Sequence, residues 1–179
     1  KQDPAKGLCM TANNDFENGR ALVTGAGAGI GRAIAHRLAA GGARVACLDV
    51  DEDAARAVAL ELAEFGEAGL GMAVDVSDEE AVGRAVAEAA GDRGGLDVVV
   101  NNAGVVVIKS FAGTTLEEWD RTQSVNLRSL FLVCQAALPH LRESQAASIV
   151  NIASMAAFRF TVPHVAYAAS KGAVVSFTR

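Results

Sequence analysis

Two residues near the end of the printed sequence, Tyr167 and Lys171, have the types and the spacing needed for proton transfer. Residues at positions i and i+4 lie on one face of a helix, so the lysine ammonium can approach the phenol oxygen. A free tyrosine has a pKa of about 10, and a nearby positive charge stabilises the phenolate and lowers that pKa. The pair therefore predicts a general acid and base at Tyr167. The same spacing also arises by chance, in which case Tyr167 is an ordinary half-buried aromatic residue and Lys171 a solvated one.

Two more polar residues, Ser154 and Asn126, precede this pair and are further candidates. Ser154 follows the apolar run "SIVNIA" and lies 13 residues before Tyr167. Its hydroxyl can hold a substrate oxygen by a hydrogen bond and orient it toward Tyr167. The alternatives are that Ser154 is a turn hydroxyl and that Asn126 is a mid-helix amide bonded to the backbone.

A glycine-rich segment, "TGAGAGIG" at residues 24–31, lies between a short apolar run and a segment of helical period. Glycine lets the backbone turn tightly and approach a ligand closely. The N–H groups at the start of the following helix have no partner within it and can bind a pyrophosphate. The segment therefore predicts a phosphate-binding loop with Gly25, Gly27, Gly29 and Gly31. Glycines also occur in such turns for geometry alone, so the segment by itself leaves that alternative open.

The carboxylate of Asp49 ends the next apolar run, "ACLDV", about 20 residues after the glycines. A carboxylate at this place can accept hydrogen bonds from an adenosine ribose and repels a 2′-phosphate. Asp49 therefore predicts a preference for NAD over NADP. The alternative is that Asp49 caps the following helix, for which Asp51 and Asp53 are equally available.

Short apolar runs alternate with longer segments of helical period from Arg20 onward. This alternation is typical of βαβ units and a parallel sheet. The expected strands are residues 21–24, 44–49, 71–75, 96–101 and 148–152. Between the first two strands, one helix is expected to place Ile30, Ile34 and Leu38 on one face and to end at Gly41 and Gly42. The second helix is expected to do the same with Val58, Leu62 and Phe65.

Two helix starts match the S/T-x-x-E pattern of a capping box. Ser77 and Glu80 form one such pair, and Thr115 and Glu118 form the other. The second pair begins the longest helical segment, which is expected to run from residue 116 to about 141. Its apolar stripe is wide enough to pack both on the sheet and on a partner subunit. The stripe consists of Leu127, Leu130, Phe131, Cys134, Leu138 and Leu141.

The composition of the 179 residues, 51% apolar and 21% charged, is that of one globular domain. The net charge of −5 disfavours nucleic acid as a partner, and the sequence has no apolar run long enough for a membrane span. Cys9, Cys47 and Cys134 are far apart, which predicts no metal site and reduced thiols in the cytoplasm. Residues 20–179 are predicted to form the domain. Residues 1–19 are expected to be a flexible arm or a cloning remnant.

These motifs, taken in order, resemble those of the short-chain dehydrogenase/reductase family. The glycine segment matches the TGxxxGxG pattern of the family, and "NNAG", "VNL", "IAS" and "YAASK" follow it. The resemblance implies an α/β fold with a doubly wound parallel sheet of Rossmann-type βαβ units. It also implies the strand order 3-2-1-4-5. Further C-terminal strands of the family are expected to be missing from this chain.

The resemblance also implies roles for individual residues. The catalytic residues would be Asn126, Ser154, Tyr167 and Lys171, with Asn126 holding a water that carries protons away from Lys171. Lys171 would also contact the nicotinamide ribose of NAD. The implied cofactor-binding residues are Gly25, Gly27, Gly29, Ile30, Gly31, Asp49, Asp75, Val76, Asn102, Ala103, Gly104, Tyr167 and Lys171. The pair Asp75 and Val76 would contact the adenine.

The expected function is NAD-dependent interconversion of a secondary alcohol and a ketone, both small molecules. A homo-oligomer is expected, either a dimer or a tetramer, in which subunits meet through the long helix and the helix of Tyr167. The segment "MAAFRFTVP" departs from the family, because Phe158 and Phe160 add bulk that could narrow the substrate side. The family also continues beyond the YxxxK helix, so the chain is expected to be a fragment of a longer enzyme. Two alternatives are a nucleotide-binding module without catalysis and a sugar-nucleotide epimerase.

Overall fold

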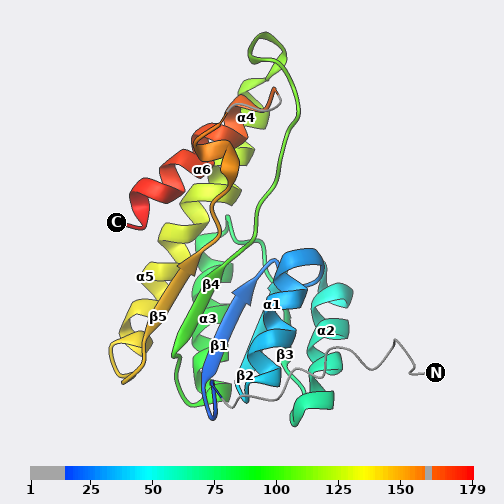
Figure 1. Cartoon of the computed structure of the whole chain (residues 1–179), viewed down its shortest axis with the longest axis vertical. Coiled ribbons are helices and arrows are strands. Elements are labelled where there is room, and N and C mark those ends of the chain that lie inside the picture. Colours follow the sequence, from blue (N-terminus) through cyan, green and yellow to red (C-terminus); the bar gives the residue numbers. More distant parts are fainter. Residues whose placement is uncertain (1–14, 160–162) are drawn as a thin grey trace, which may run out of the picture.

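The computed structural model describes residues 15–159 and 163–179 (Figure 1). Within these ranges it contains a sheet of five parallel strands in the order β3-β2-β1-β4-β5. The strands are β1 (Arg20–Thr24), β2 (Arg44–Asp49), β3 (Leu70–Ala73), β4 (Val98–Asn101) and β5 (Ser148–Asn151). The predicted strand order is therefore confirmed. Three strands are shorter than predicted, because β3 ends before Asp75, β4 begins after Leu96 and β5 ends before Ile152.

Helices cover both faces of this sheet, which makes it doubly wound. They are α1 (Gly29–Ala40), α2 (Glu52–Glu61), α3 (Glu79–Arg93), α4 (Leu116–Gln123), α5 (Ser129–Leu141) and α6 (Val165–Phe177). Successive side chains of a strand point to opposite faces. In β1, Leu22 accordingly packs in the cluster formed with α3 and α5, whereas Ala21 and Val23 pack in the cluster formed with α1 and α2. None of the helices in the described part of the chain is long and apolar enough to cross a membrane.

The first two helices agree only in part with the predicted apolar faces. Helix α1 ends where predicted, and Gly42 has the positive φ of 94° that favours glycine. However, Ile30 lies at the exposed start of α1, with 65% of its surface accessible, and does not share the buried face with Leu38. Phe65 is also partly exposed, because α2 ends at Glu61 and a short 3₁₀ turn (Leu62–Phe65) follows.

One predicted capping box is confirmed and the other is wrong. Thr115 accepts a hydrogen bond from the Glu118 N–H, and Glu118 accepts one from the Thr115 N–H. At α3, however, Asp78 is the cap and accepts the Ala81 N–H at 3.1 Å. The Ser77 hydroxyl donates instead to the Asp75 carboxylate at 2.7 Å. Asp75 thus holds Ser77 in a turn before the helix, which leaves the cap to the next residue.

The long helix predicted for residues 116–141 is interrupted. Helices α4 and α5 are joined by a π-helical segment, Ser124–Arg128, in which the Ser129 N–H reaches back to the Ser124 carbonyl. Part of the predicted stripe is buried, including Leu130 and Leu141. Phe131 is 51% exposed and Leu138 is also exposed. A partner subunit on these exposed residues stays a prediction.

The predicted arm falls partly outside the described residues, since residues 1–14, with Cys9, lie there. Of the rest, Phe16 packs against the α1 and α2 cluster, and its N–H donates to the Gly41 carbonyl at 2.9 Å. The boundary at residue 19 stays a prediction.

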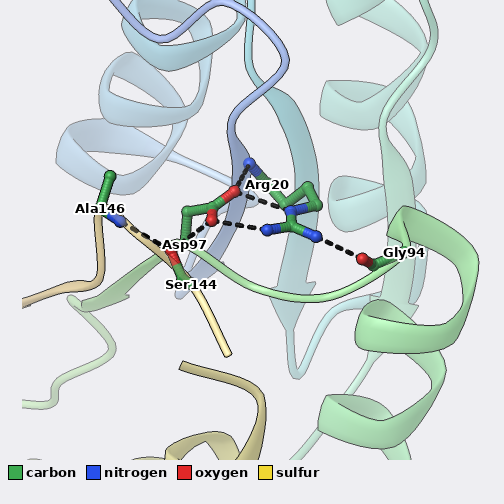
Figure 2. A network of polar contacts seen from close by, with 5 residues as sticks. All are labelled: Arg20, Gly94, Asp97, Ser144 and Ala146. Carbon is green, nitrogen blue, oxygen red and sulfur yellow. Dashed lines mark hydrogen bonds and ion pairs between the residues drawn. The ribbon is translucent and has the colours of Figure 1, made fainter. Parts of the chain in front are cut away.

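The amino ends of the strands are tied together by an ion pair between Arg20 and Asp97 (Figure 2). The Arg20 guanidinium donates to both Asp97 oxygens, at 2.7 Å each, and also to the Gly94 carbonyl. The Ser144 hydroxyl, from the loop before β5, donates to the same carboxylate at 2.5 Å. The hydrogen bonds from Arg20 are the main reason that the pKa of Asp97 is lowered to about 2. One carboxylate thus joins β1 to the loops before β4 and β5.

We expect Asp97→Asn to destabilise the fold in a pH-dependent way. The folded pKa lies below the ordinary value of 3.8, so the stabilisation is present above that value and is lost as the pH falls toward 2. It amounts to about 2 kcal/mol at neutral pH. Urea unfolding at pH 7 and at pH 3 measures it, and the loss caused by the variant should be smaller at pH 3. Glu67→Gln, which breaks the exposed pair with Arg44, is the control and should cost less than about 0.5 kcal/mol. Equal losses in both variants would contradict the prediction.

Candidate active site

The glycine segment lies at the carboxyl end of β1 and leads directly into α1. Gly25 has a φ of 63°, and a Cβ at this residue would lie 2.9 Å from the Ala103 Cα. A Cβ on Gly31 would overlap the Gly25 carbonyl oxygen. The loop is therefore folded on itself so tightly that side chains at these two positions are excluded.

The start of α1 differs from the starts of α2, α3 and α4. Each of those three helices is capped by a side chain, from Asp51, Asp78 and Thr115, and has acidic residues in its first turn. Helix α1 begins after Ala28, with no side-chain cap and no acidic residue in its first turn. A Cβ on Gly29 would meet nothing within 4 Å. The first N–H groups of α1 therefore have no side-chain cap among the described residues and can bind an external anion.

The "NNAG" segment holds the glycine loop in place. The Thr24 hydroxyl accepts the N–H groups of Asn102 and Ala103, each at 3.1 Å. The Asn102 side chain donates to the carbonyls of Thr24 and Gly25, each at 3.0 Å. The role of Thr24 was not predicted, although the residue is part of the TGxxxGxG pattern that identified the loop. The Asn102 amide positions the loop, and its predicted role in cofactor binding stays a prediction.

Asp49 is tied to the same loop at the carboxyl end of β2. Its carboxylate accepts the Gly27 N–H at 2.9 Å and the Asp51 N–H at 3.1 Å. The alternative role as a helix cap is wrong, because Asp51 caps α2 by accepting the Ala54 N–H. Each carboxylate oxygen has further lone pairs. Asp49 can therefore still accept hydrogen bonds from a ligand.

A cavity of about 240 Å³ lies beside the loop and collects many of the predicted cofactor residues. The predicted residues in its wall are Gly25, Asp49, Asp75, Val76, Ala103 and Gly104. Arg121 also lines it, and no sequence pattern singled out this residue. The pKa of Asp75 is lowered, first by the hydrogen bonds from Ser77 and then by the charge of Arg121. One wall of the cavity is thus negatively charged at neutral pH.

Lys171 reaches the end of this region from α6 and is almost entirely buried, with 4% of its surface exposed. Its Nζ donates to the Ile152 carbonyl at 2.7 Å and lies 5.8 Å from the centre of the Tyr167 ring. A Cβ built on Gly104 would lie 3.6 Å from the same Nζ. Burial lowers the pKa of Lys171. The structure therefore brings the predicted Tyr167 and Lys171 together on one helix beside the NNAG segment.

Asn126 lies in the π-helical segment and is fully buried. Its side-chain oxygen accepts the Val105 N–H at 2.7 Å, and its nitrogen donates to the Val105 carbonyl at 2.9 Å and to the Ser170 hydroxyl at 3.0 Å. The side chain thus joins the segment after "NNAG" to α6. Its predicted contact with a water stays a prediction. The contact with Ser170 was not predicted, since serine at that place in "YAASK" carries no signal of its own.

Ser154 begins a short 3₁₀ turn (Met155–Ala157) that packs against α6. Its hydroxyl accepts the Ala156 N–H at 3.2 Å, and it remains a donor for a second partner. The Tyr167 ring packs against His164, with ring centres 5.6 Å apart. Phe158 is exposed, and Phe160 lies outside the described residues. The predicted narrowing of the substrate side therefore stays a prediction.

The chain rises beyond the sheet after β4 to the start of α4, and α6 lies beside α4 (Figure 1). Tyr167 and Lys171 are therefore carried by a helix that packs on the Asn126-bearing stretch as well as on the turn after Ser154. No group of three or more His, Cys, Asp or Glu side chains is placed to hold a metal ion within residues 15–159 and 163–179.

Comparison with known proteins gives consistent matches over the described domain. The family model of the short chain dehydrogenases matches residues 20–179. D-threitol dehydrogenase of Mycolicibacterium smegmatis is 42% identical over 159 residues, which are 89% of this chain and 61% of that protein. A probable galactose dehydrogenase of Rhizobium meliloti is 37% identical, over 92% of this chain and 65% of that protein. This chain thus spans less than two thirds of the length of these relatives.

A solved structure gives the same result for the fold. The crystal structure of a short-chain type dehydrogenase/reductase from Mycobacterium marinum superposes with a TM-score of 0.87 at 35% identity. The match covers 93% of this chain and 66% of the other.

Proposed function

Because this chain belongs to the short-chain dehydrogenase/reductase family, we propose that it interconverts a secondary alcohol and a ketone with NAD. Tyr167 is the general acid and base in this proposal. The observation that carries it is the buried Lys171 Nζ beside the Tyr167 ring and next to Gly104, which lines the cavity by the glycine loop. The printed names of the relatives support oxidoreduction of hydroxyl groups in general.

The residues at the glycine loop fit a dinucleotide. Gly25 and Gly31 let the loop fold tightly on itself, and the uncapped start of α1 offers its N–H groups to a pyrophosphate. In this proposal Asp49 accepts hydrogen bonds from a ribose, and the cavity that Asp75 and Val76 line together with Asp49 takes an adenine. Bound NAD would supply the hydride acceptor.

The proton is moved by the residues of this chain. In the direction of oxidation, the O–H bond of the alcohol breaks and its proton passes to the Tyr167 phenolate oxygen. In this proposal the Lys171 ammonium, which is 4% exposed, stabilises that phenolate before the transfer. The Ser154 hydroxyl holds the substrate oxygen in place. In the direction of reduction, Tyr167 returns the proton.

The preference for NAD is supported by three acidic residues at and just after the end of β2, Asp49, Asp51 and Glu52. We expect Asp49→Asn to weaken NAD binding about tenfold, because a charged acceptor is lost. The ratio of NADP affinity to NAD affinity should rise, because a carboxylate no longer repels the 2′-phosphate. Calorimetric titration with each nucleotide measures both effects.

Asp51→Asn is the matched control for this prediction. It removes the same charge two residues away, and asparagine keeps the cap of α2. Equal effects of the two variants on the ratio would show that only the overall charge matters, and the proposed role of Asp49 would be wrong.

The enzymatic proposal is tested by following NADH formation with a panel of secondary alcohols. The panel should include sugars and sugar alcohols, because the relatives are named for D-threitol and galactose. Turnover with at least one compound is expected. NAD binding without turnover on the whole panel would support the alternative, a nucleotide-binding module without catalysis.

A homo-oligomer, as a dimer or tetramer, is proposed through the exposed apolar residues Phe131 and Leu138 of α5 and Phe177 of α6. Analytical ultracentrifugation that finds only monomer would count against it. A cytoplasmic location stays a prediction.

A further inference from the structure

We propose that Ser170 is a positioning residue for the pair Tyr167 and Lys171, and that it acts through Asn126. The proposal rests on the proposed function, since it assigns Ser170 a role in the same proton transfer. It goes beyond the family motif YxxxK, because that motif names only the tyrosine and the lysine and Ser170 lies between them.

Ser170 is fully buried and uses its hydroxyl twice. The hydroxyl donates to the Tyr167 carbonyl at 2.7 Å, one turn back in α6. Its proton is therefore committed, and its oxygen can only accept from Asn126. The hydrogen bond from the Asn126 Nδ2, at 3.0 Å, satisfies that requirement.

The Ser170 hydroxyl and the Val105 backbone together fix which way the Asn126 amide points. Nδ2 must face Ser170, and the oxygen must face the Val105 N–H, which lies at 2.7 Å. The same oxygen lies beside Gly104, where an added Cβ would be 3.4 Å from it and 3.6 Å from the Lys171 Nζ. The Asn126 side-chain oxygen and the Lys171 Nζ thus both lie close to Gly104.

A second hydrogen bond joins the same two helical stretches. The Gln123 side chain, at the end of α4, donates to the Ala166 carbonyl at 3.0 Å. Together the two bonds hold the first two turns of α6 against the end of α4 and the π-helical segment. Only the bond at Ser170 involves Asn126, and Lys171 is the next residue along α6. Ser170 is therefore the link between the amide of Asn126 and the position of the proposed catalytic pair.

Ser129 offers a matched control for the removal of this hydroxyl. It is also buried, with 3% of its surface exposed, and it also donates to a carbonyl of its own helix, that of Val125, at 2.6 Å. The hydrogen bonds of these described residues give it no link to Asn126. Ser129→Ala and Ser170→Ala thus remove the same type of intrahelical bond, and only the second disturbs Asn126.

We expect Ser170→Ala to lower kcat about tenfold, the scale of a small displacement of catalytic groups. The KM for NAD should stay within about twofold of the wild-type value, because the glycine loop is untouched. The acidic limb of the pH–rate profile should move to higher pH, because the phenolate is less well stabilised. Ser129→Ala should change none of these. In an Asn126→Ala background, Ser170→Ala should have little further effect, because the two residues act as a unit.

A measurement without turnover separates this proposal from the proposed function. The sequence contains a single tyrosine, so the near-ultraviolet absorbance of phenolate reports Tyr167 alone. At one fixed alkaline pH, Ser170→Ala should show a smaller phenolate fraction than the wild type and Ser129→Ala the same fraction. If the wild type turns over no alcohol, the proposed function fails while this comparison still tests Ser170. Equal phenolate fractions in all three proteins, or additive effects with Asn126→Ala, would overturn the proposal.

Discussion

Replacing Tyr167 by phenylalanine is expected to lower kcat by about 10³-fold or more. The substitution removes one oxygen atom and keeps the ring, which still packs against His164. No other tyrosine exists in the sequence to take over the proton transfer. NADH formation under saturating substrate measures the loss, and calorimetric titration with NAD measures cofactor binding in the same variant.

NAD affinity should stay within about twofold of the wild-type value, because the substitution leaves the glycine loop and Asp49 unchanged. Circular dichroism should show an unchanged fold. Turnover close to the wild-type rate would rule out Tyr167 as the general acid and base. Loss of NAD binding together with turnover would instead give the ring a role in holding the cofactor.

Gly31→Ala is expected to abolish nucleotide binding, with an affinity loss of about 100-fold or more. The new Cβ would overlap the Gly25 carbonyl and lie 2.5 Å from the Asn102 side-chain nitrogen. The loop must open to admit it, which breaks the bonds from Asn102 to the Thr24 and Gly25 carbonyls. Calorimetric titration with NAD checks the result.

Gly83→Ala is the matched control for that prediction. Gly83 lies in α3, and a Cβ there would meet nothing within 4 Å. This variant should bind NAD normally and gain up to about 1 kcal/mol of stability from helix propensity. Thermal unfolding of both variants separates loss of binding from loss of folding. Unchanged NAD affinity in a folded Gly31→Ala protein would contradict the role of the glycine loop.

The sequence predicted the parts of the fold that depend on local pattern. The alternation of apolar runs and helical segments depends only on residues close together in the sequence. The same is true of the Thr115 capping box. The start of α3 was predicted wrongly, because Ser77 and Asp78 are both good caps. The choice between them depends on Asp75, whose carboxylate takes the Ser77 hydroxyl.

The site residues that a motif names could be predicted from the sequence. The contacts between segments far apart in the chain could not. Tyr167 and Lys171 follow from helical spacing, and the structure places them together. The link from Ser170 through Asn126 to Val105 joins three segments, so no window of sequence contains it. The π-helical segment at Asn126 could not be predicted either, because its residue types do not distinguish it from an α-helix.

The ion pair at the amino ends of the strands is also formed by residues far apart in the chain. Arg20 and Asp97 are 77 residues apart, and Ser144 is a further 47 residues along the chain (Figure 2). Each of these residues, taken alone, resembles an ordinary polar residue of a protein surface, so none of them predicts the contact. Only the parallel order of β1, β4 and β5 brings them together.

The most direct test of the proposed NAD-dependent activity is parallel calorimetric titration of the wild-type protein with NAD and NADP. The uncapped start of α1, the glycine loop and Asp49 predict saturable binding of NAD, with NADP at least about tenfold weaker. No binding of either nucleotide, or tighter binding of NADP than of NAD, would contradict it.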